Sequence, residues 1–129
     1  MKEATQNWIT LSEKEFKLAE LSLKGDEPIG IIYHLHAAVE KVLKAIYEET
    51  KGTPPKIHNL RKLAIECYGS QIKSQEEKLF NMLDKAFIDS RYPKSIKQFE
   101  NDYNISSCKE LIKETKELIK CLKNIPTKN

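Results

Sequence analysis

The stretch from Pro28 to Lys51 carries apolar residues at the spacing of a long amphipathic helix. Proline fits the first turn of a helix, where its missing N–H costs nothing, and Gly52 followed by Pro54 ends the pattern. The apolar positions form an arc wide enough to contact two neighbours. They are Ile31, Ile32, Leu35, Ala38, Val39, Val42, Leu43 and Ile46. Such a segment needs more than one packing partner, which favours a bundle of helices.

Four more segments have helical periodicity, and most of the links between them are short. They span about 8–24, 59–68, 75–90 and 108–122. The chain has only four glycines and five prolines, too few turns for a sandwich or barrel of many short strands. The sequence therefore predicts an all-α fold. We expect an antiparallel up-and-down four-helix bundle with an additional short helix, forming a single domain over residues 1–129.

Three of the helix starts carry N-cap signals. These are Asp26, the capping-box pair Ser74 and Glu77, and the capping-box pair Ser107 and Glu110. The connection over residues 91–106 is longer than the roughly 2–8 residues usual between bundle helices, and long connections are often functional. It contains Phe99 and Tyr103, so we expect it to pack back on the bundle.

The charge balance excludes little by itself. Twenty-two basic and 19 acidic residues give a net charge of +3, too slight to indicate nucleic-acid binding without a basic cluster. Only Arg61 and Arg91 are arginines, the residue better suited to grip a phosphate with two hydrogen bonds. Three widely spaced cysteines indicate neither a disulfide framework nor a zinc site. No long uncharged run is present, so we expect a cytoplasmic protein without a membrane segment.

No common enzyme motif is present. The chain lacks the glycine-rich loops that hold phosphates, the GxSxG nucleophile elbow and the HExxH zinc motif. The sequence accordingly predicts no catalytic residue, no cofactor and no metal site.

Polar residues form a row along one edge of the apolar arc in the segment Pro28–Lys51. They step by three or four residues, so they share one side of the helix: Tyr33, His36, Glu40, Lys44 and Tyr47. Partly desolvated groups at such an edge can hold a ligand or a second subunit. The alternative is an ordinary boundary stripe whose pairs contribute a few tenths of a kcal/mol each. Glu15 also interrupts an apolar face, and we expect it to meet a cation, an interface or water.

Two further positions have a functional and a structural interpretation. His58 follows a proline-containing link and is a candidate ligand or base, although the structural interpretation, in which His58 or Asn59 caps the helix that follows and ties down the proline link, is favoured. Arg91, at the end of a predicted helix, can bind a phosphate or neutralise the carbonyls of the last turn.

Taken in order, several of these segments resemble the HEPN domain family. The stretch A-A-V-E-K-V-L-K-A from Ala37 to Ala45 is similar to the family's A-x-E-K-x-L-K-A core. Ile57 to Leu60 resembles the T-H-x-L segment after a proline-containing loop, and Arg91-Tyr92-Pro93 resembles R-Y-P. Trp8 with Leu18-Ala19 matches the opening helix, so the likeness spans nearly the whole chain.

The resemblance implies a helical homodimer that is often encoded beside a minimal nucleotidyltransferase, frequently as a toxin–antitoxin pair. It also implies nucleotide or RNA binding. Several branches of the family are metal-independent RNases in which an arginine is followed after four to six residues by a histidine. After Arg91 the corresponding positions are Ile96, Lys97 and Gln98, so that motif is absent.

We therefore expect a non-catalytic HEPN-type module that binds a nucleotide, RNA or a nucleotidyltransferase. The expected ligand-binding residues are Tyr33, His36, Glu40, Lys44, Arg91 and Tyr92, with His58 as a structural or secondary candidate. One alternative is an RNase toxin whose histidine is displaced to His36 or His58. The other is a dimeric interaction subunit that has no ligand.

Overall fold

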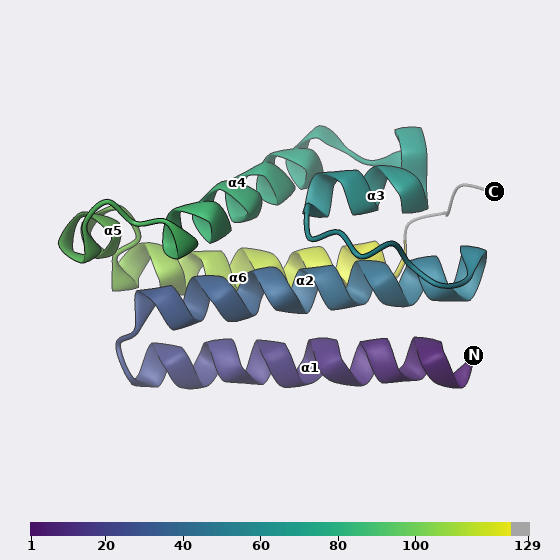
Figure 1. Cartoon of the computed structure of the whole chain (residues 1–129), viewed down its shortest axis with the longest axis horizontal. Helices are drawn as coiled ribbons and strands as arrows, with labels where there is room; N and C mark the ends of the chain where they lie inside the picture. Colours follow the sequence, from purple (N-terminus) through teal and green to yellow (C-terminus); the bar gives the residue numbers. More distant parts are fainter. Residues whose placement is uncertain (125–129) are drawn as a thin grey trace.

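The computed structural model describes residues 1–124 as a bundle of helices without a strand in that part of the chain (Figure 1). Four long helices and two short ones follow one another, with a single 3₁₀ turn between the third and fourth. Their bounds are α1 Glu3–Lys24, α2 Pro28–Lys51, α3 Leu60–Tyr68, η1 Gly69–Gln71, α4 Ser74–Arg91, α5 Ile96–Asp102 and α6 Ile105–Leu122. This confirms the predicted all-α bundle.

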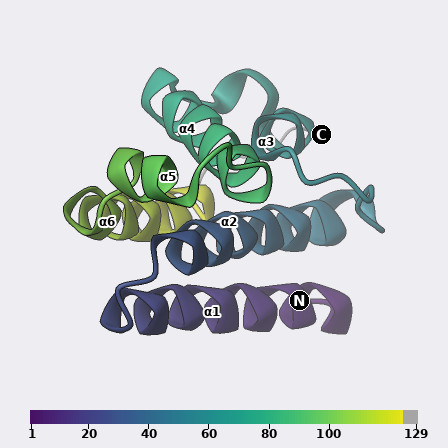
Figure 2. The ribbon, with the colours of Figure 1, turned by 60° about the vertical axis from the view of Figure 1, so that its left-hand side comes forward.

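Helix α2 is the element around which the others are arranged. It contacts α1, α3, α4 and α6, as its wide apolar arc requires. Figure 2 shows α1 running antiparallel along one side of α2, with α3 and α4 on the opposite side. Apolar residues of α2 such as Ile31, Leu35 and Val39 are completely buried, and they pack with Phe80 and Leu83 of α4 in one core.

The helix ends differ from the prediction in several places. Helix α1 begins at Glu3, not near Trp8, and α2 follows Glu27 with no side-chain cap from Asp26. Ser74 and Ser107 lie inside α4 and α6. The free backbone N–H groups at the starts of these two helices are paired with other side chains. Glu76 accepts from the Lys73 N–H, and Asn104 accepts from the Ser107 N–H. Asn59 caps α3, as one of the two predicted alternatives for that position.

The long connection after α4 contains a helix that the sequence did not predict. Helix α5 begins after Ser95, whose hydroxyl caps it, and it buries Phe99 against the bundle. The ring of Phe99 lies 4.7 Å from that of Tyr103, and the Tyr103 hydroxyl donates to Asp89 at 2.7 Å. The expectation that this connection packs back on the bundle is confirmed.

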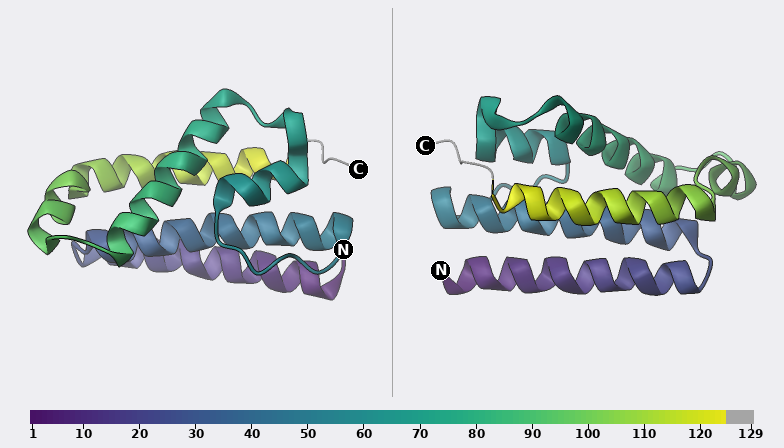
Figure 3. Two further views of the ribbon diagram at one scale, coloured as in Figure 1. Left: turned by 45° about the horizontal axis from the view of Figure 1, so that its top comes forward. Right: turned by 180° about the vertical axis from the view of Figure 1, so that it is seen from behind.

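The link between α2 and α3 positions the functional site. It leaves the C-terminal end of α2 and returns across that helix, as the left view of Figure 3 shows. This path brings His58, at the end of the link, back to Glu40 in the middle of α2. No helix within residues 1–124 is long and apolar enough to cross a membrane.

Candidate functional site

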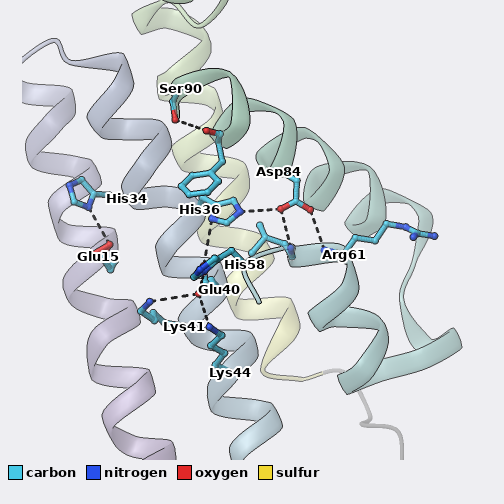
Figure 4. A network of polar contacts seen from close by, with 12 residues as sticks. Glu15, His34, His36, Glu40, Lys41, Lys44, His58, Arg61, Asp84 and Ser90 are labelled. Atoms are coloured by element: carbon cyan, nitrogen blue, oxygen red, sulfur yellow. Dashed lines mark hydrogen bonds and ion pairs between the residues drawn. The ribbon is translucent and has the colours of Figure 1, made fainter. Parts of the chain in front are cut away.

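Three polar residues of α2 are almost completely enclosed by the fold. His36, Glu40 and Lys44 are 1%, 4% and 5% exposed, although each carries a polar or charged group. They lie on successive turns beneath α4 and the link to α3 (Figure 4). The sequence placed this row at a partly desolvated edge. In the structure the row is buried more deeply than expected, because α4 and the returning link cover it from two directions.

Glu40 is the centre of this buried network. Its carboxylate accepts a hydrogen bond from Lys44 Nζ at 2.8 Å and one from His58 Nδ1 at 3.1 Å, and Lys41 Nζ lies 3.9 Å away. Burial raises the pKa of Glu40, but the hydrogen bonds from Lys44 and His58 and the charges of Lys44 and Lys41 outweigh it, so its pKa lies below the ordinary value. The carboxylate is therefore ionised and can only accept hydrogen bonds.

The second carboxylate of the network belongs to α4. Asp84 accepts the backbone N–H groups of Leu60 at 3.0 Å and Arg61 at 3.4 Å, so it binds the N-terminus of α3. His36 Nε2 lies 3.0 Å from the same carboxylate, and we assign it as the donor because both Asp84 oxygens already accept hydrogen bonds from α3. His36 Nδ1 then has no hydrogen-bond partner in the described residues and faces Glu40 Oε1 at 3.9 Å. Asp84 thus ties α2, α3 and α4 together.

Asp84 was not predicted as a site residue. The available signal was a charge within the apolar pattern of α4, between Leu83 and Phe87. Glu15 gave the same kind of signal in α1, and it lies 3.2 Å from His34 Nδ1 of α2. A charge that interrupts an apolar face is explained in both cases by a partner on another helix.

A stack of three side chains connects the buried network with the surface. The ring of Phe87 lies on that of His36, with centroids 4.0 Å apart and planes 12° from parallel. The guanidinium of Arg91 lies 5.4 Å from the Phe87 centroid on the same helix, within the range of a cation–π contact. Asp84 holds His36, His36 supports Phe87, and Phe87 positions Arg91.

The exposed side of this stack is hereafter the Arg91 face, made of Tyr33, Phe87 and Arg91, and Tyr92 follows Arg91 in the chain. Tyr33 is 49% exposed with its ring 6.0 Å from that of Phe87, and Tyr92 is 75% exposed. No carboxylate within residues 1–124 lies within 4.0 Å of the Arg91 guanidinium, whereas Arg61 lies 3.7 Å from Glu77. The Arg91 face therefore presents a positive charge that the described part of the chain does not neutralise.

The six predicted ligand residues thus separate into two groups. Tyr33 and Arg91 are exposed at the Arg91 face, and Tyr92 is exposed beside the hollow next to α5. His36, Glu40 and Lys44 lie in the interior and hold other protein groups. His58 differs from both groups, because its side chain is 65% exposed while Nδ1 is fixed by the buried Glu40.

Two of the three cysteines, Cys67 and Cys108, are buried. Burial raises the pKa of Cys67 to about 12 and that of Cys108 to about 11, so both thiols stay protonated near neutral pH. A protonated thiol is a poor nucleophile. Residues 1–124 contain no group of three or more histidine, cysteine, aspartate or glutamate side chains placed to hold a metal ion.

Comparisons with known proteins agree on the fold. The family model described as HEPN domain matches residues 5–125. A crystal structure of TT1696 from Thermus thermophilus superposes with a TM-score of 0.80 at 14% identity, covering 95% of this chain and 98% of that one. At that identity the likeness to TT1696 shows a shared fold alone. No curated protein matches the chain.

Proposed function

The chain belongs to the HEPN domain family, and we propose that it is a non-catalytic binding module whose Arg91 face binds the phosphate of a nucleotide or RNA. The observation that carries this proposal is the exposed and unneutralised guanidinium of Arg91, held in place by Phe87. Arginine forms paired hydrogen bonds with phosphate oxygens, and a positioned side chain loses less entropy on binding.

Exposed tyrosine side chains near Arg91 suit the base of such a ligand. Tyr92 follows Arg91 directly, and Tyr33 approaches the supporting ring of Phe87. Bases of single-stranded nucleic acids stack on exposed aromatic rings with little regard to sequence. A phosphate contact at Arg91 next to the exposed ring of Tyr33, with Tyr92 one residue further along the chain, is therefore a combination that favours single-stranded RNA or a nucleotide.

Cleavage has less support than binding. Ile96, Lys97 and Gln98 occupy the positions where family RNases carry a histidine, and they begin α5. Neither Ile96 nor Gln98 can transfer a proton, and lysine has an unperturbed pKa of about 10.4. His36 is 1% exposed, which counts against it as one of the two displaced-histidine candidates.

The RNase alternative therefore depends on His58. Its ring is exposed and Glu40 orients it, an arrangement that a general base requires. Expression of the chain alone separates the two functions. A toxin of this kind arrests growth and cleaves RNA without added metal, whereas a binding module does neither.

A protein partner has a separate observation in its favour. The last two turns of α4 expose Ile88 and Tyr92 on one side, at 57% and 75%, and Ile96 of α5 is 54% exposed. Exposed apolar groups near a binding face are typical of interaction surfaces. We propose that this region contacts a second copy of the chain or a minimal nucleotidyltransferase. Light scattering of the chain alone and co-purification with such a partner distinguish the two.

The binding proposal is tested by replacing each arginine in turn. Arg91→Ala should lower the affinity for a labelled single-stranded RNA by about tenfold, because it removes a charge-assisted phosphate contact. Arg61→Ala is the matched control, since it removes the same charge from an exposed site on α3. Fluorescence anisotropy measures both affinities. An RNA affinity that is the same in Arg91→Ala and Arg61→Ala would overturn binding at the Arg91 face. Absence of RNA and nucleotide binding by the unmodified chain would favour a dimeric interaction subunit without a ligand.

A further inference from the structure

A narrow apolar trough lies between α1 and α6, over the middle of α2. It consists of two hollows of about 250 and 350 Å³, which share Ile9 of α1, Val42 of α2 and Lys123 of α6. The two hollows follow one another along α1 from Met1 to Phe16, a distance of about 22 Å at a rise of about 1.5 Å per residue. The right view of Figure 3 shows α6 and α1 running beside each other, with α2 behind α6. No residue of the Arg91 face lines this trough.

The floor of the trough is apolar, and its hydroxyl groups are already occupied. Its apolar side chains come from all three helices: Ile9, Phe16, Val42, Ile46 and Ile119. The hydroxyl of Thr5 donates to Glu49 at 2.8 Å. The hydroxyl of Ser12 donates to the Ala38 carbonyl at 2.7 Å. The part of a ligand that lies on this floor must therefore be apolar, because a polar group there would lose its hydrogen bonds with water.

The α6 rim of the trough carries a row of lysines. Lys116, Lys120 and Lys123 are exposed and are spaced by four and three residues, so they share one side of α6. Lys120 pairs with Glu117 at 3.5 Å, whereas Lys116 and Lys123 make no ion pair within residues 1–124. This rim is therefore a row of positive charge beside an apolar floor, which suits an apolar ligand with an anionic end.

Two glutamates line the trough away from the lysine row. Glu13 is exposed on α1, and Glu49 lies near the end of α2. Glu49 already accepts hydrogen bonds from the Lys2 backbone N–H at 3.1 Å and from the Thr5 hydroxyl. These carboxylates repel an anion from the α1 side, so the anionic end of a ligand belongs at the α6 rim.

The width of the trough selects between a helix and a single hydrocarbon chain. Helices α1 and α6 contact each other directly, whereas a helix with its side chains is about 10–12 Å across, so the trough has no room for one between them. An alkyl chain is only as wide as its methylene groups. We infer that the trough binds a free long-chain carboxylate, with the alkyl chain on the apolar floor and the carboxylate at the lysine row. This site goes beyond the proposed function and stands or falls separately from it.

Titration calorimetry with laurate, kept below its micelle concentration, tests this site in the unmodified chain. The affinity should fall from laurate through decanoate to octanoate by about fourfold for each methylene removed, because each one buries apolar surface. Decanol keeps the chain of decanoate and loses its charge. It should bind about threefold to fivefold more weakly than decanoate, the loss expected for an exposed ion pair.

Substitutions assign the two ends of the ligand to the two parts of the trough. Ile9→Gln places a polar group in the shared middle and should weaken laurate and decanol alike, by about tenfold. Its control is Leu11→Gln, at a 43% exposed position of α1 outside the trough. Lys116→Gln combined with Lys123→Gln should weaken laurate about fivefold and leave decanol unchanged. Its control is Lys113→Gln, which lines the hollow between α4 and α6 instead.

Thermal unfolding provides a second measurement on the same proteins. The midpoint of each variant without laurate shows whether the fold is retained. A rise of the midpoint with laurate reports binding independently of the heat of titration.

Several results would overturn the carboxylate site. Absence of laurate binding by the unmodified chain does so, as does an affinity that ignores chain length or falls equally in Ile9→Gln and Leu11→Gln. Binding to phosphatidylglycerol vesicles without binding to free laurate would assign the trough to a membrane surface. A dimer that Ile9→Gln dissociates, in a chain that does not bind laurate, would assign it to a second copy. None of these results affects the anisotropy measurement of RNA, because the substituted residues lie outside the Arg91 face.

Discussion

Glu40 illustrates how one buried carboxylate organises several elements. It holds Lys44 on its own helix and His58 on the returning link, and its lowered pKa reflects those partners. An ion pair of this kind contributes little net stability relative to a well-packed apolar pair, but removing one member leaves an uncompensated buried charge. The network therefore fixes the positions of Lys44 and His58. Its effect on the free energy of unfolding becomes large when one member is removed.

Replacement of Glu40 should reveal its charge through the pH dependence of stability. Glu40→Gln leaves the buried ammonium of Lys44 without a counter-charge, so we expect a loss of about 3 kcal/mol of unfolding free energy near pH 7. Because the folded pKa of Glu40 is lowered, its contribution is fully present above the ordinary value of 4.5 and is lost as the pH falls through the folded pKa.

The difference in unfolding free energy between the wild type and Glu40→Gln should therefore shrink on acidification below about pH 4.5. Urea unfolding at neutral and acidic pH measures it. Glu114→Gln, at an exposed position of α6, is the control and should stay within about 0.5 kcal/mol of the wild type at neutral pH. A difference that stays constant or grows on acidification would contradict this role of Glu40.

Asp84 has a different role at the residue scale, because it replaces missing helix hydrogen bonds. Asp84→Asn retains the shape but loses two charge-assisted interactions, with the N-terminus of α3 and with His36. We expect a loss of about 2–3 kcal/mol of unfolding free energy, measured by urea titration. Asp102→Asn, at an exposed site of α5, should cost no more than about 0.5 kcal/mol. Similar losses in the two variants would show that Asp84 does not tie the helices together.

At the scale of elements, the stability of α5 needs the most explanation, because this helix is very short. Seven residues make fewer than two turns, so α5 depends on its contacts for stability. Phe99 is 4% exposed and is the one buried residue of this helix. Tyr103 follows it and is joined to α4 through Asp89.

Phe99→Ala should accordingly cost about 3–5 kcal/mol of unfolding free energy, through lost burial and the cavity left behind. Ile96→Ala shortens an apolar side chain of the same helix that is 54% exposed, and it should change stability by less than about 0.5 kcal/mol. Chemical denaturation of both variants provides the comparison. Equal stability of the two would mean that α5 does not pack on the bundle.

The same elements show how far the sequence determines the fold. Helices α1, α2, α4 and α6 run for several turns, so their periodicity is visible, whereas α5 is too short to repeat its pattern. The row on α2 follows from spacing within one helix, and it was predicted correctly as a shared side. Its burial was not predictable, because it depends on how α4 and the 52–59 link return over His36 and Glu40. Asp84 was missed for the same reason, since its partners lie on two other helices.

At the scale of the whole molecule, the buried network separates two exposed surfaces. The Arg91 face lies beyond Phe87 at the end of α4, and a cluster of Trp8, Lys41 and His58 lies where α1, α2 and the link to α3 meet. The left view of Figure 3 shows the α4 end and the returning link at different places along α2. The Arg91 face and the link between α2 and α3 are therefore separate parts of the surface.

The central claim is that the chain binds RNA through Arg91 and does not cleave it. The most direct measurement incubates one labelled single-stranded RNA with the purified chain and a metal chelator, then follows anisotropy and the integrity of the RNA together. The account predicts saturable binding, loss of most of that affinity in Arg91→Ala but not in Arg61→Ala, and RNA that stays intact throughout. Cleavage by the wild type, or binding that is unchanged in Arg91→Ala, would contradict it.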